Sequence, residues 1–469
     1  MQAKNLLIIM SDEHRRDAMG CMGHGQVKTP HLDALAARGA VFENAYTPSP
    51  MCVPARAAFA TGKQVCDIGY WDSATPYDGR VRSWMHALRD GGREVVSIGK
   101  LHFRSGEDDN GFSEEILPMH VVGGVGWAVG LLRENPPAYD SAAELAADVG
   151  VGSSSYTDYD LAITAAAENW LAQRGEEPWA AFVSLVSPHY PLTCPQKFYD
   201  LYDPDEMDLP VGWRDVPDHP EVQNIAEFFA YDGYFDEAKA RQAKAAYFGL
   251  TSFMDHCVGR VLAALEASGQ AEDTLVIYVS DHGEMLGDQG LWTKQVMYEA
   301  SAGVPMIVAG PGVPAGRRVR TAASLLDVAE TAFGLARGEA AGVVALANAT
   351  DDPARVVMSE YHDGGSKTGA FMIRWDRWKY VYYAGQRAQL FDLAEDPEER
   401  RDLALEAGFS DVLAQGEALL RARCNPDGVN AQAFADQASR IAELGGERAC
   451  QEAFVFNHTP TPVEQAEMG

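Results

Sequence analysis

The chain has 469 residues, of which 46% are hydrophobic and 23% charged, and its formal net charge at pH 7 is −30. This is an ordinary globular composition. The negative field disfavours nucleic acid, anionic membrane surfaces and polyanionic glycans as partners. It does not exclude a small anionic substrate, because local charges decide what a site binds.

The first residues and the cysteines indicate where the protein works. The first apolar run, residues 5–10, is too short for a signal-peptide core and ends at acidic residues. No stretch is long and apolar enough to span a membrane. Seven scattered cysteines without a metal-type spacing argue against a disulfide framework and for a reducing compartment. We therefore expect a cytoplasmic protein with no membrane or nucleic-acid partner.

Helices and strands alternate along most of the chain. The predicted strands are residues 5–10, 41–46, 94–100, 179–186, 274–280, 304–309 and 354–361. The predicted helices are residues 29–39, 82–90, 157–174, 236–268 (one helix or two) and 325–335. Several strands are apolar throughout, which is typical of a large, mostly parallel central sheet with helices on both faces. Residues 105–155 are rich in Gly, Pro, Asp and Ala, and they predict a loop-rich insert that builds a substrate pocket.

The pattern changes near residue 365. Short antiparallel strands are predicted at residues 370–375, 379–383 and 389–392, followed by a charged helix at 398–405 and another helix at 410–423. A polar tail after about residue 425 either covers the site or packs on a neighbouring subunit. We therefore predict a catalytic α/β domain, residues 1–365, and a smaller C-terminal α+β subdomain with a short antiparallel sheet, residues 366–469.

Cys52 lies in a proline-broken loop just before another predicted helix. Pro54 suits the first helical position, and Gly62 can end the helix. Cys52 is therefore expected at a helix N-terminus, where the dipole favours negative charge, with Arg56 on the same face. The alternative is that Cys52 is a buried small hydrophobic residue. This segment alone slightly favours the alternative.

Acidic residues, histidines and a lysine recur just past the ends of predicted strands. They are Asp12, Glu13, Lys100, His102, His189, Asp281 and His282. Strand C-termini share one edge of a parallel sheet, so these side chains are expected to converge. Each has a simpler structural explanation on its own: Asp281 could make a turn, and Lys294 could be a solvated surface charge.

Together these residues suit the transfer of a tetrahedral oxyanion. Asp12, Glu13 and Asp281 offer oxygen ligands for a hard divalent cation, and His282 adds a nitrogen that Mn²⁺ tolerates better than Ca²⁺. The groups that can neutralise charge or move protons are Arg56, Lys100, His102, His189 and Lys294. Cys52 is then the candidate nucleophile.

The segment Cys52-x-Pro54-x-Arg56, followed by Thr61-Gly62, resembles the maturation signature of the type I sulfatases in the alkaline phosphatase superfamily. The resemblance covers nearly the whole chain. Its other segments are residues 5–12, 29–33, 99–102, 187–191, 280–284, 294, 389–393 and 396–397. The run from residue 283 to 305 looks most like the choline-sulfatase and phosphonate monoester hydrolase branch. Val53 and Ala55 depart from the small hydroxyl residues common in the signature.

The resemblance implies an alkaline phosphatase-like fold and a role for each site residue. A maturation enzyme oxidises the family's cysteine to formylglycine, and a hydroxyl of the aldehyde hydrate attacks sulfur beside a divalent metal. In this chain the nucleophile would be Cys52, held by Arg56 and Lys100, with Asp281 helping to activate it. His189 and Lys294 would support the sulfate and the departing oxygen, while His102 would take the proton that collapses the intermediate. The implied metal ligands are Asp12, Glu13, Cys52, Asp281 and His282, with Ca²⁺ expected first and Mn²⁺ as the alternative.

The leading hypothesis is a cytoplasmic sulfatase that acts on a small sulfate monoester. The alternative is a hydrolase of phosphonate monoesters or phosphodiesters that uses the same formylglycine and metal, and both activities can coexist in one site. A third interpretation is a binding or structural protein on this scaffold without turnover, because a fold does not guarantee chemistry. We also expect a homo-oligomer.

Overall fold

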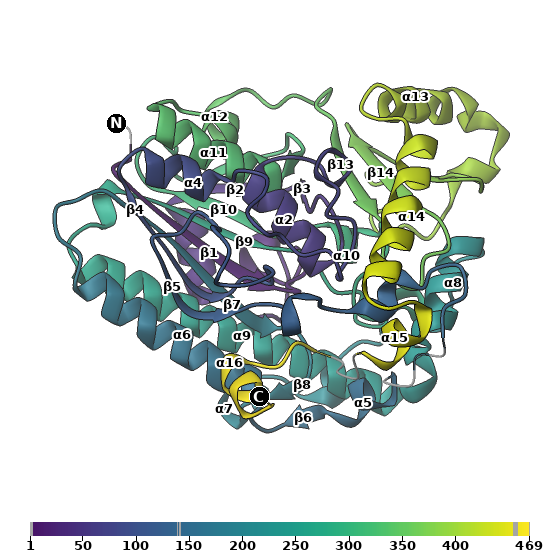
Figure 1. The fold of residues 1–469 in the computed structure, drawn as a ribbon, viewed down its shortest axis with the longest axis horizontal. Coiled ribbons are helices and arrows are strands. Elements are labelled where there is room, and N and C mark those ends of the chain that lie inside the picture. Colours follow the sequence, from purple (N-terminus) through teal and green to yellow (C-terminus); the bar gives the residue numbers. More distant parts are fainter. Residues whose placement is uncertain (1–2, 138, 140–141, 454–457, 469) are drawn as a thin grey trace.

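A computed structural model describes residues 3–137, 139, 142–453 and 458–468. Its centre is an eight-stranded sheet with the order β11-β2-β10-β9-β1-β7-β4-β5 (Figure 1). These strands are β1 (Asn5–Asp12), β2 (Gly39–Phe42), β4 (Glu94–Lys100), β5 (Glu114–Met119), β7 (Trp179–Pro188), β9 (Thr274–Ser280), β10 (Met306–Ala309) and β11 (Arg317–Val319). Strand β1 pairs in parallel with β7 and β9, and β4 pairs in parallel with β7 and β5. Strand β10 alone runs antiparallel to its neighbours β9 and β2. The predicted mostly parallel sheet is confirmed.

Helices cover both faces of this sheet, and β1 shows how the sequence selects them. Leu6 and Ile8 belong to one core cluster with residues of α2 (Cys52–Thr61), α4 (Trp84–Asp90) and α11 (Leu325–Arg337). Leu7 and Ile9 belong to another cluster with residues of α1 (Pro30–Ala37), α6 (Ser155–Ala172) and α9 (Glu237–Ala267). Successive residues of a strand point to opposite faces, so a strand covered on both sides must be apolar at every position.

A second sheet is antiparallel and has the order β13-β14-β15-β16. Its strands are β13 (Val357–Tyr361), β14 (Ala370–Trp375), β15 (Trp378–Tyr383) and β16 (Gln389–Asp392). The predicted C-terminal antiparallel sheet is confirmed, and helix α13 (Ser410–Arg421) packs on β14 and β15. Because β13 precedes residue 365, the sheet takes one strand from the part assigned to the catalytic domain. The division at residue 365 stays a prediction.

The remaining elements are short or peripheral to the sheets. The strands are β3 (Ala45–Tyr46), β6 (Val149–Val151), β8 (Leu192–Cys194) and β12 (Ala323–Ser324). The helices are α3 (Val65–Ile68), α5 (Ala142–Ala147), α7 (Gln196–Tyr199), α8 (Pro220–Phe229), α10 (Glu299–Ala302), α12 (Gly342–Asn348), α14 (Pro426–Glu443), α15 (Glu447–Glu452) and α16 (Pro462–Met468). Within the residues that the structure describes, no helix has the length and apolar character needed to cross a membrane.

Three predicted segments differ from the structure. The loop-rich insert contains β5, an edge strand of the main sheet whose partly exposed residues lack an apolar run. The charged helix over 398–405 is wrong: Glu399 has a left-handed φ of 55°, which breaks a helix, and its side chain turns to a buried lysine. The predicted polar tail forms α14, where the Asn425 side chain accepts from the Gly428 N–H and Pro426 takes the first position.

A buried ion cluster joins the second sheet to the rest of the protein. Lys379 of β15 is fully buried, and its Nζ lies 2.6 Å from Glu299 Oε1 and 2.7 Å from Glu399 Oε1. Burial raises the pKa of Glu399 to about 7, against the lowering effect of Lys379. Lys379 therefore bridges two acids, of which Glu299 also pairs with Arg16.

We predict that Lys379→Ala lowers the free energy of unfolding by about 3–5 kcal/mol, because the buried Glu399 carboxyl loses its cation. Urea unfolding measures the change. Arg337→Ala is the control: it removes only exposed ion pairs to Glu330 and Glu339, which water screens, so the free energy of unfolding should change little. Equal effects of the two substitutions would contradict the structural role of Lys379.

Candidate active site

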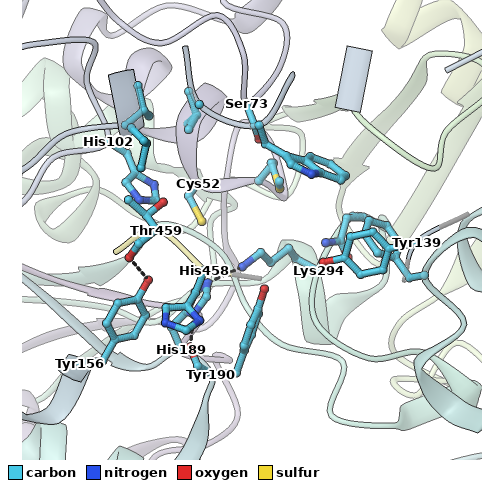
Figure 2. A pocket seen from close by; sticks show the side chains of 18 of the residues that line it. Cys52, Ser73, His102, Tyr139, Tyr156, His189, Tyr190, Lys294, His458 and Thr459 are labelled. Atoms are coloured by element: carbon cyan, nitrogen blue, oxygen red, sulfur yellow. Dashed lines mark hydrogen bonds between the residues drawn. The ribbon is translucent and has the colours of Figure 1, made fainter. Parts of the chain in front are cut away.

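Cys52 is the first residue of α2 and points into a pocket (Figure 2). The expected helix at this position is confirmed, with Pro54 as its third residue and Gly62 ending it at a left-handed φ of 67°. Only 5% of Cys52 is exposed. Burial, together with Asp12, raises the pKa of its thiol to about 12, so the thiol stays protonated at neutral pH. As it stands in the chain, Cys52 is therefore not an activated thiolate.

Arg56 ties the ends of four strands together. Its Nε donates to Asp281 Oδ2 (2.8 Å), and its Nη1 donates to the Lys100 carbonyl and to Ser184 Oγ (2.9 Å each). Its Nη2 lies 3.6 Å from Asp12 Oδ2. Burial would lower the pKa of Arg56, but Asp281 and Asp12 raise it above its ordinary value. The guanidinium is a fixed buried cation that holds two carboxylates in place.

Four buried side chains converge as a potential metal site. Asp12, Cys52, Asp281 and His282 each offer a ligand atom, and these atoms all lie within 4.8 Å of one another. His282 Nε2 is 2.9 Å from Cys52 Sγ and 3.5 Å from Asp12 Oδ1. His282 Nδ1 lies 3.0 Å from the Gly283 carbonyl, which can only accept. Nδ1 therefore carries the proton, and Nε2 presents a lone pair to the group.

Glu13 lies outside this group of four. Its carboxyl oxygens lie 3.0 Å from Lys294 Nζ and 3.4 Å from His189 Nε2. Burial raises the pKa of Glu13 to about 8, although Lys294 opposes the shift. Its backbone has a left-handed φ of 65°, and its N–H donates to Asp281 Oδ1 (3.3 Å). The expectation that Glu13 binds the metal stays a prediction.

His189 and Lys294 form a pair of neutral base and cation. Lys294 Nζ lies 2.9 Å from His189 Nε2, and His189 Nδ1 lies 2.6 Å from the Tyr190 carbonyl. The carbonyl accepts from Nδ1, so Nε2 accepts from the ammonium. Burial and Lys294 hold the pKa of His189 well below its usual range. Burial would lower the pKa of Lys294, but Cys52 and Glu13 raise it above its ordinary value.

Strand β4 ends at Lys100, and His102 follows. The Lys100 ammonium pairs with the Asp12 carboxylate. Burial would raise the pKa of Asp12, but Lys100 and His189 hold it well below the ordinary value. His102 lines the pocket, is 6% exposed, and neither ring nitrogen has a hydrogen-bond partner among the described residues. Burial and Lys100 hold the pKa of His102 well below its usual value, so its ring is neutral.

The pocket above Cys52 combines a polar floor with an aromatic wall (Figure 2). The aromatic residues in its lining are Trp127, Tyr139, Tyr156, Tyr190, Phe229 and Tyr231. Phe229 stacks on Tyr231 with 12° between the rings and on Trp127 with 27°. Two of these residues, Trp127 and Tyr139, come from the insert that was predicted to build a pocket.

Every residue selected from the sequence thus reaches one edge of the sheet, but three contributors were missed. Asp160 of α6 accepts from the N–H groups of Val186 (2.7 Å) and Ser187 (2.8 Å), just before His189. It lies on the buried face of its helix, so an acid on an apolar stripe was the available signal. His458 and Thr459 also line the pocket. Nothing in the polar tail marked them.

Sequence comparisons agree with this site. The family model described as "Sulfatase" matches residues 4–339, and that described as "N-sulphoglucosamine sulphohydrolase, C-terminal" matches residues 287–424. The choline-sulfatase of Rhizobium meliloti (strain 1021) is 32% identical over 426 residues, covering 85% of this chain and 82% of that protein. The arylsulfatase K of Danio rerio is 28% identical over 448 residues, covering 89% and 83%.

Solved structures share the fold. The phosphonate monoester hydrolase of Agrobacterium radiobacter aligns with a TM-score of 0.72 and 23% identity, covering 92% of this chain and 96% of that one. The structure of BT4656 in complex with its substrate D-glucosamine-2-N,6-O-disulfate aligns with a TM-score of 0.73 and 19% identity, covering 93% and 99%. Together, the fold, the site and the relatives define a sulfuric ester hydrolase of the alkaline phosphatase superfamily. The chain belongs to the sulfatase family.

We predict that Asp160→Ala lowers kcat for sulfate ester hydrolysis by about 10–100-fold, because His189 loses its fixed position. It also orphans two buried N–H groups, at about 1–3 kcal/mol each in the free energy of unfolding. Steady-state kinetics and urea unfolding measure the two effects. Asp158→Ala, an exposed change on the same helix, should alter neither appreciably. An unchanged kcat in Asp160→Ala would show that this acid does not position His189.

Proposed function

We propose that the protein hydrolyses a small sulfate monoester to an alcohol and inorganic sulfate, using formylglycine at position 52 and one divalent metal ion. The observation that carries the proposal is the placement of Cys52. It starts a helix within the group formed with Asp12, Asp281 and His282, and its Sγ lies 2.9 Å from a histidine nitrogen. A protonated thiol is a poor nucleophile there, whereas an aldehyde hydrate at the same position would be well placed.

Formylglycine at position 52 rests on the signature Cys52-x-Pro54-x-Arg56 and on a maturation enzyme that oxidises the cysteine. The hydrate of such an aldehyde would supply one hydroxyl to displace the alcohol from sulfur and a second whose deprotonation would expel sulfate. The side chain at position 52 is held at the N-terminus of α2, where the helix dipole favours developing negative charge.

The residues present fit a divalent cation. Asp12 and Asp281 offer carboxylate oxygens, and His282 offers a nitrogen whose proton is held on the opposite side of the ring. Oxygen-rich ligands suit Ca²⁺, and the imidazole makes Mn²⁺ the alternative. Such an ion would supply positive charge beside the nucleophile and the sulfate oxygens.

The surrounding side chains divide the remaining work. Arg56 holds Asp281 and Asp12 in register, so the ligand oxygens are oriented before substrate arrives. Lys294 and Lys100 are cations that can pair with the ester oxygens. His189, held by Lys294, lies beside the position of the departing oxygen. His102, whose two ring nitrogens have no hydrogen-bond partner in the described part of the chain, takes the proton released when sulfate leaves.

The alcohol is inferred to be compact, because the cavity above Cys52 has a volume of only about 90 Å³ and a largely aromatic wall. Aromatic faces attract apolar groups and alkylammonium cations alike. Choline sulfate, the substrate class named by the Rhizobium meliloti relative, is one ester that such a wall would accept. A cytoplasmic location and homo-oligomeric assembly are further proposals from the sequence.

We predict that a peptide spanning residue 52 has a mass about 18 Da below that of its cysteine form, because a thiol is replaced by a carbonyl. Mass spectrometry of protein produced with a maturation enzyme checks this. Cys52→Ala should abolish turnover while leaving the thermal unfolding midpoint close to that of the wild type. Cys257→Ala, a buried cysteine in α9, is the matched control and should retain turnover. Full activity in Cys52→Ala would refute the assignment of the nucleophile.

We predict that chelation removes both a single bound divalent ion and sulfate ester hydrolysis, and that adding back Ca²⁺ or Mn²⁺ restores both. Elemental analysis measures the ion, and His282→Ala should lower its affinity at least about tenfold. Parallel assays of an aryl sulfate and an aryl phosphonate monoester test the reaction class. A large excess of phosphonate turnover would replace the sulfatase by the alternative hydrolase.

A further inference from the structure

A C-terminal segment, residues 458–468, returns to the active-site pocket (Figure 1). It follows the helices of the C-terminal region, yet His458 and Thr459 line the same pocket as Cys52 and His189. Figure 2 shows His458 among the residues that line the pocket, and it shows the bond between Tyr156 and Thr459. More than 400 residues thus separate this part of the wall from the nucleophile in sequence.

The segment is anchored by hydrogen bonds at both of its ends. The Tyr156 hydroxyl donates to the Thr459 carbonyl (2.7 Å), and the Gln465 amide donates to the His120 carbonyl (3.3 Å). Helix α16 is stabilised internally, because the Thr461 N–H and hydroxyl both donate to Glu464 Oε2 (2.7 and 2.8 Å). Thr461 is only 3% exposed. These contacts hold the segment against the start of α6 and the end of β5.

His458 completes an aromatic shell around the substrate pocket. Its ring centroid lies 5.0 Å from that of Tyr156 and 6.4 Å from that of Tyr190, both edge-on. Tyr190 in turn stacks on His189 with 4.4 Å between centroids. The charged groups that act on His458 are Glu464, Lys100 and Asp148, and burial keeps its pKa low, so the ring is neutral. A neutral ring in this position acts by shape and contact rather than by charge.

We propose that His458 determines specificity by forming the wall against which the alcohol part of the ester packs. This inference rests on the proposed function, since it assigns the substrate class of the same site. With this wall in place the enzyme hydrolyses compact alkyl sulfates in preference to bulky aryl or glycan sulfates. The sulfate itself is held elsewhere, by Lys294 and the group around Cys52, so His458 acts on the alcohol and not on sulfate transfer.

The first test compares two substrates in the full-length, matured, metal-loaded enzyme. His458→Ala should raise the ratio of kcat/KM for 4-methylumbelliferyl sulfate over propyl sulfate by about tenfold or more, which is the scale on which pocket shape discriminates. The change should come mainly from KM. Val463→Ala is the matched control: it lies on the same segment but is 69% exposed, and its ratio should stay near that of the wild type.

A second variant separates the wall from the fold of the segment. Tyr156→Phe keeps the ring and removes only the hydrogen bond to Thr459, so it should shift the same ratio in the same direction by less. An unchanged ratio in both His458→Ala and Tyr156→Phe would overturn the proposal. A fall in kcat for both esters alike in His458→Ala would also overturn it, because that pattern belongs to the chemical step.

Binding distinguishes a failure of this inference from a failure of the proposed function. In a Cys52→Ala background, calorimetry measures the Kd of both esters with and without His458→Ala. A shift in the ratio of the two Kd values, with no turnover by the wild type, would sustain the wall while removing the proposed reaction. Turnover by the wild type with no shift in either ratio would remove the wall and leave the reaction standing.

Discussion

A buried network of opposite charges at the carboxyl edge of the main sheet is the constraint that organises this protein. Arg56 and Lys100 are both within 1% of full burial, and they face Asp12 and Asp281, which are fully buried. Buried charges are tolerated only when they are paired and bonded, so each strand end must deliver its residue to a fixed position. The two cations and two anions cancel. A divalent ion, if bound as proposed, would give this balanced group the excess positive charge that favours an anionic ester.

The surrounding fold supplies the positions that this network needs. Parallel strands β1, β4, β7 and β9 bring their C-terminal ends to one edge. Helix α2 begins at the same edge, so its first turns place Cys52 and Arg56 there. The backbone at this edge is unusual: Glu13 and His102 adopt left-handed φ values of 65° and 54°. Such backbone conformations are costly for residues other than glycine, and they persist because surrounding hydrogen bonds and packing hold them. The strained backbone lowers the stability of the fold, but it places the functional groups.

The strand ends and the helix at Cys52 could be predicted from the sequence because local chemistry specifies them. Apolar runs such as residues 274–280 indicate a strand buried on both faces, and the polar residues that follow mark the edge. Other features depend on distant partners. Glu399 leaves a helical path because Lys379, twenty residues earlier, needs a carboxylate in the interior. In the sequence, Asp160 resembles any other acid on a helix. Its role depends on hydrogen bonds from the backbone at the end of β7, which only the folded structure shows.

The residues proposed for catalysis and those proposed for specificity come from different parts of the fold. The groups proposed to transfer sulfate come from strand ends, where topology forces convergence and substitution is tightly limited. Much of the aromatic pocket wall, proposed to contact the alcohol, comes from loop residues after β5, from the end of α8 and from the C-terminal segment, which lie outside the strands of the central sheet. Those segments can change in length and sequence without disturbing the buried charges. A fold arranged in this way keeps one reaction and varies its substrate, so the residues that identify the family are poor guides to which ester a member hydrolyses.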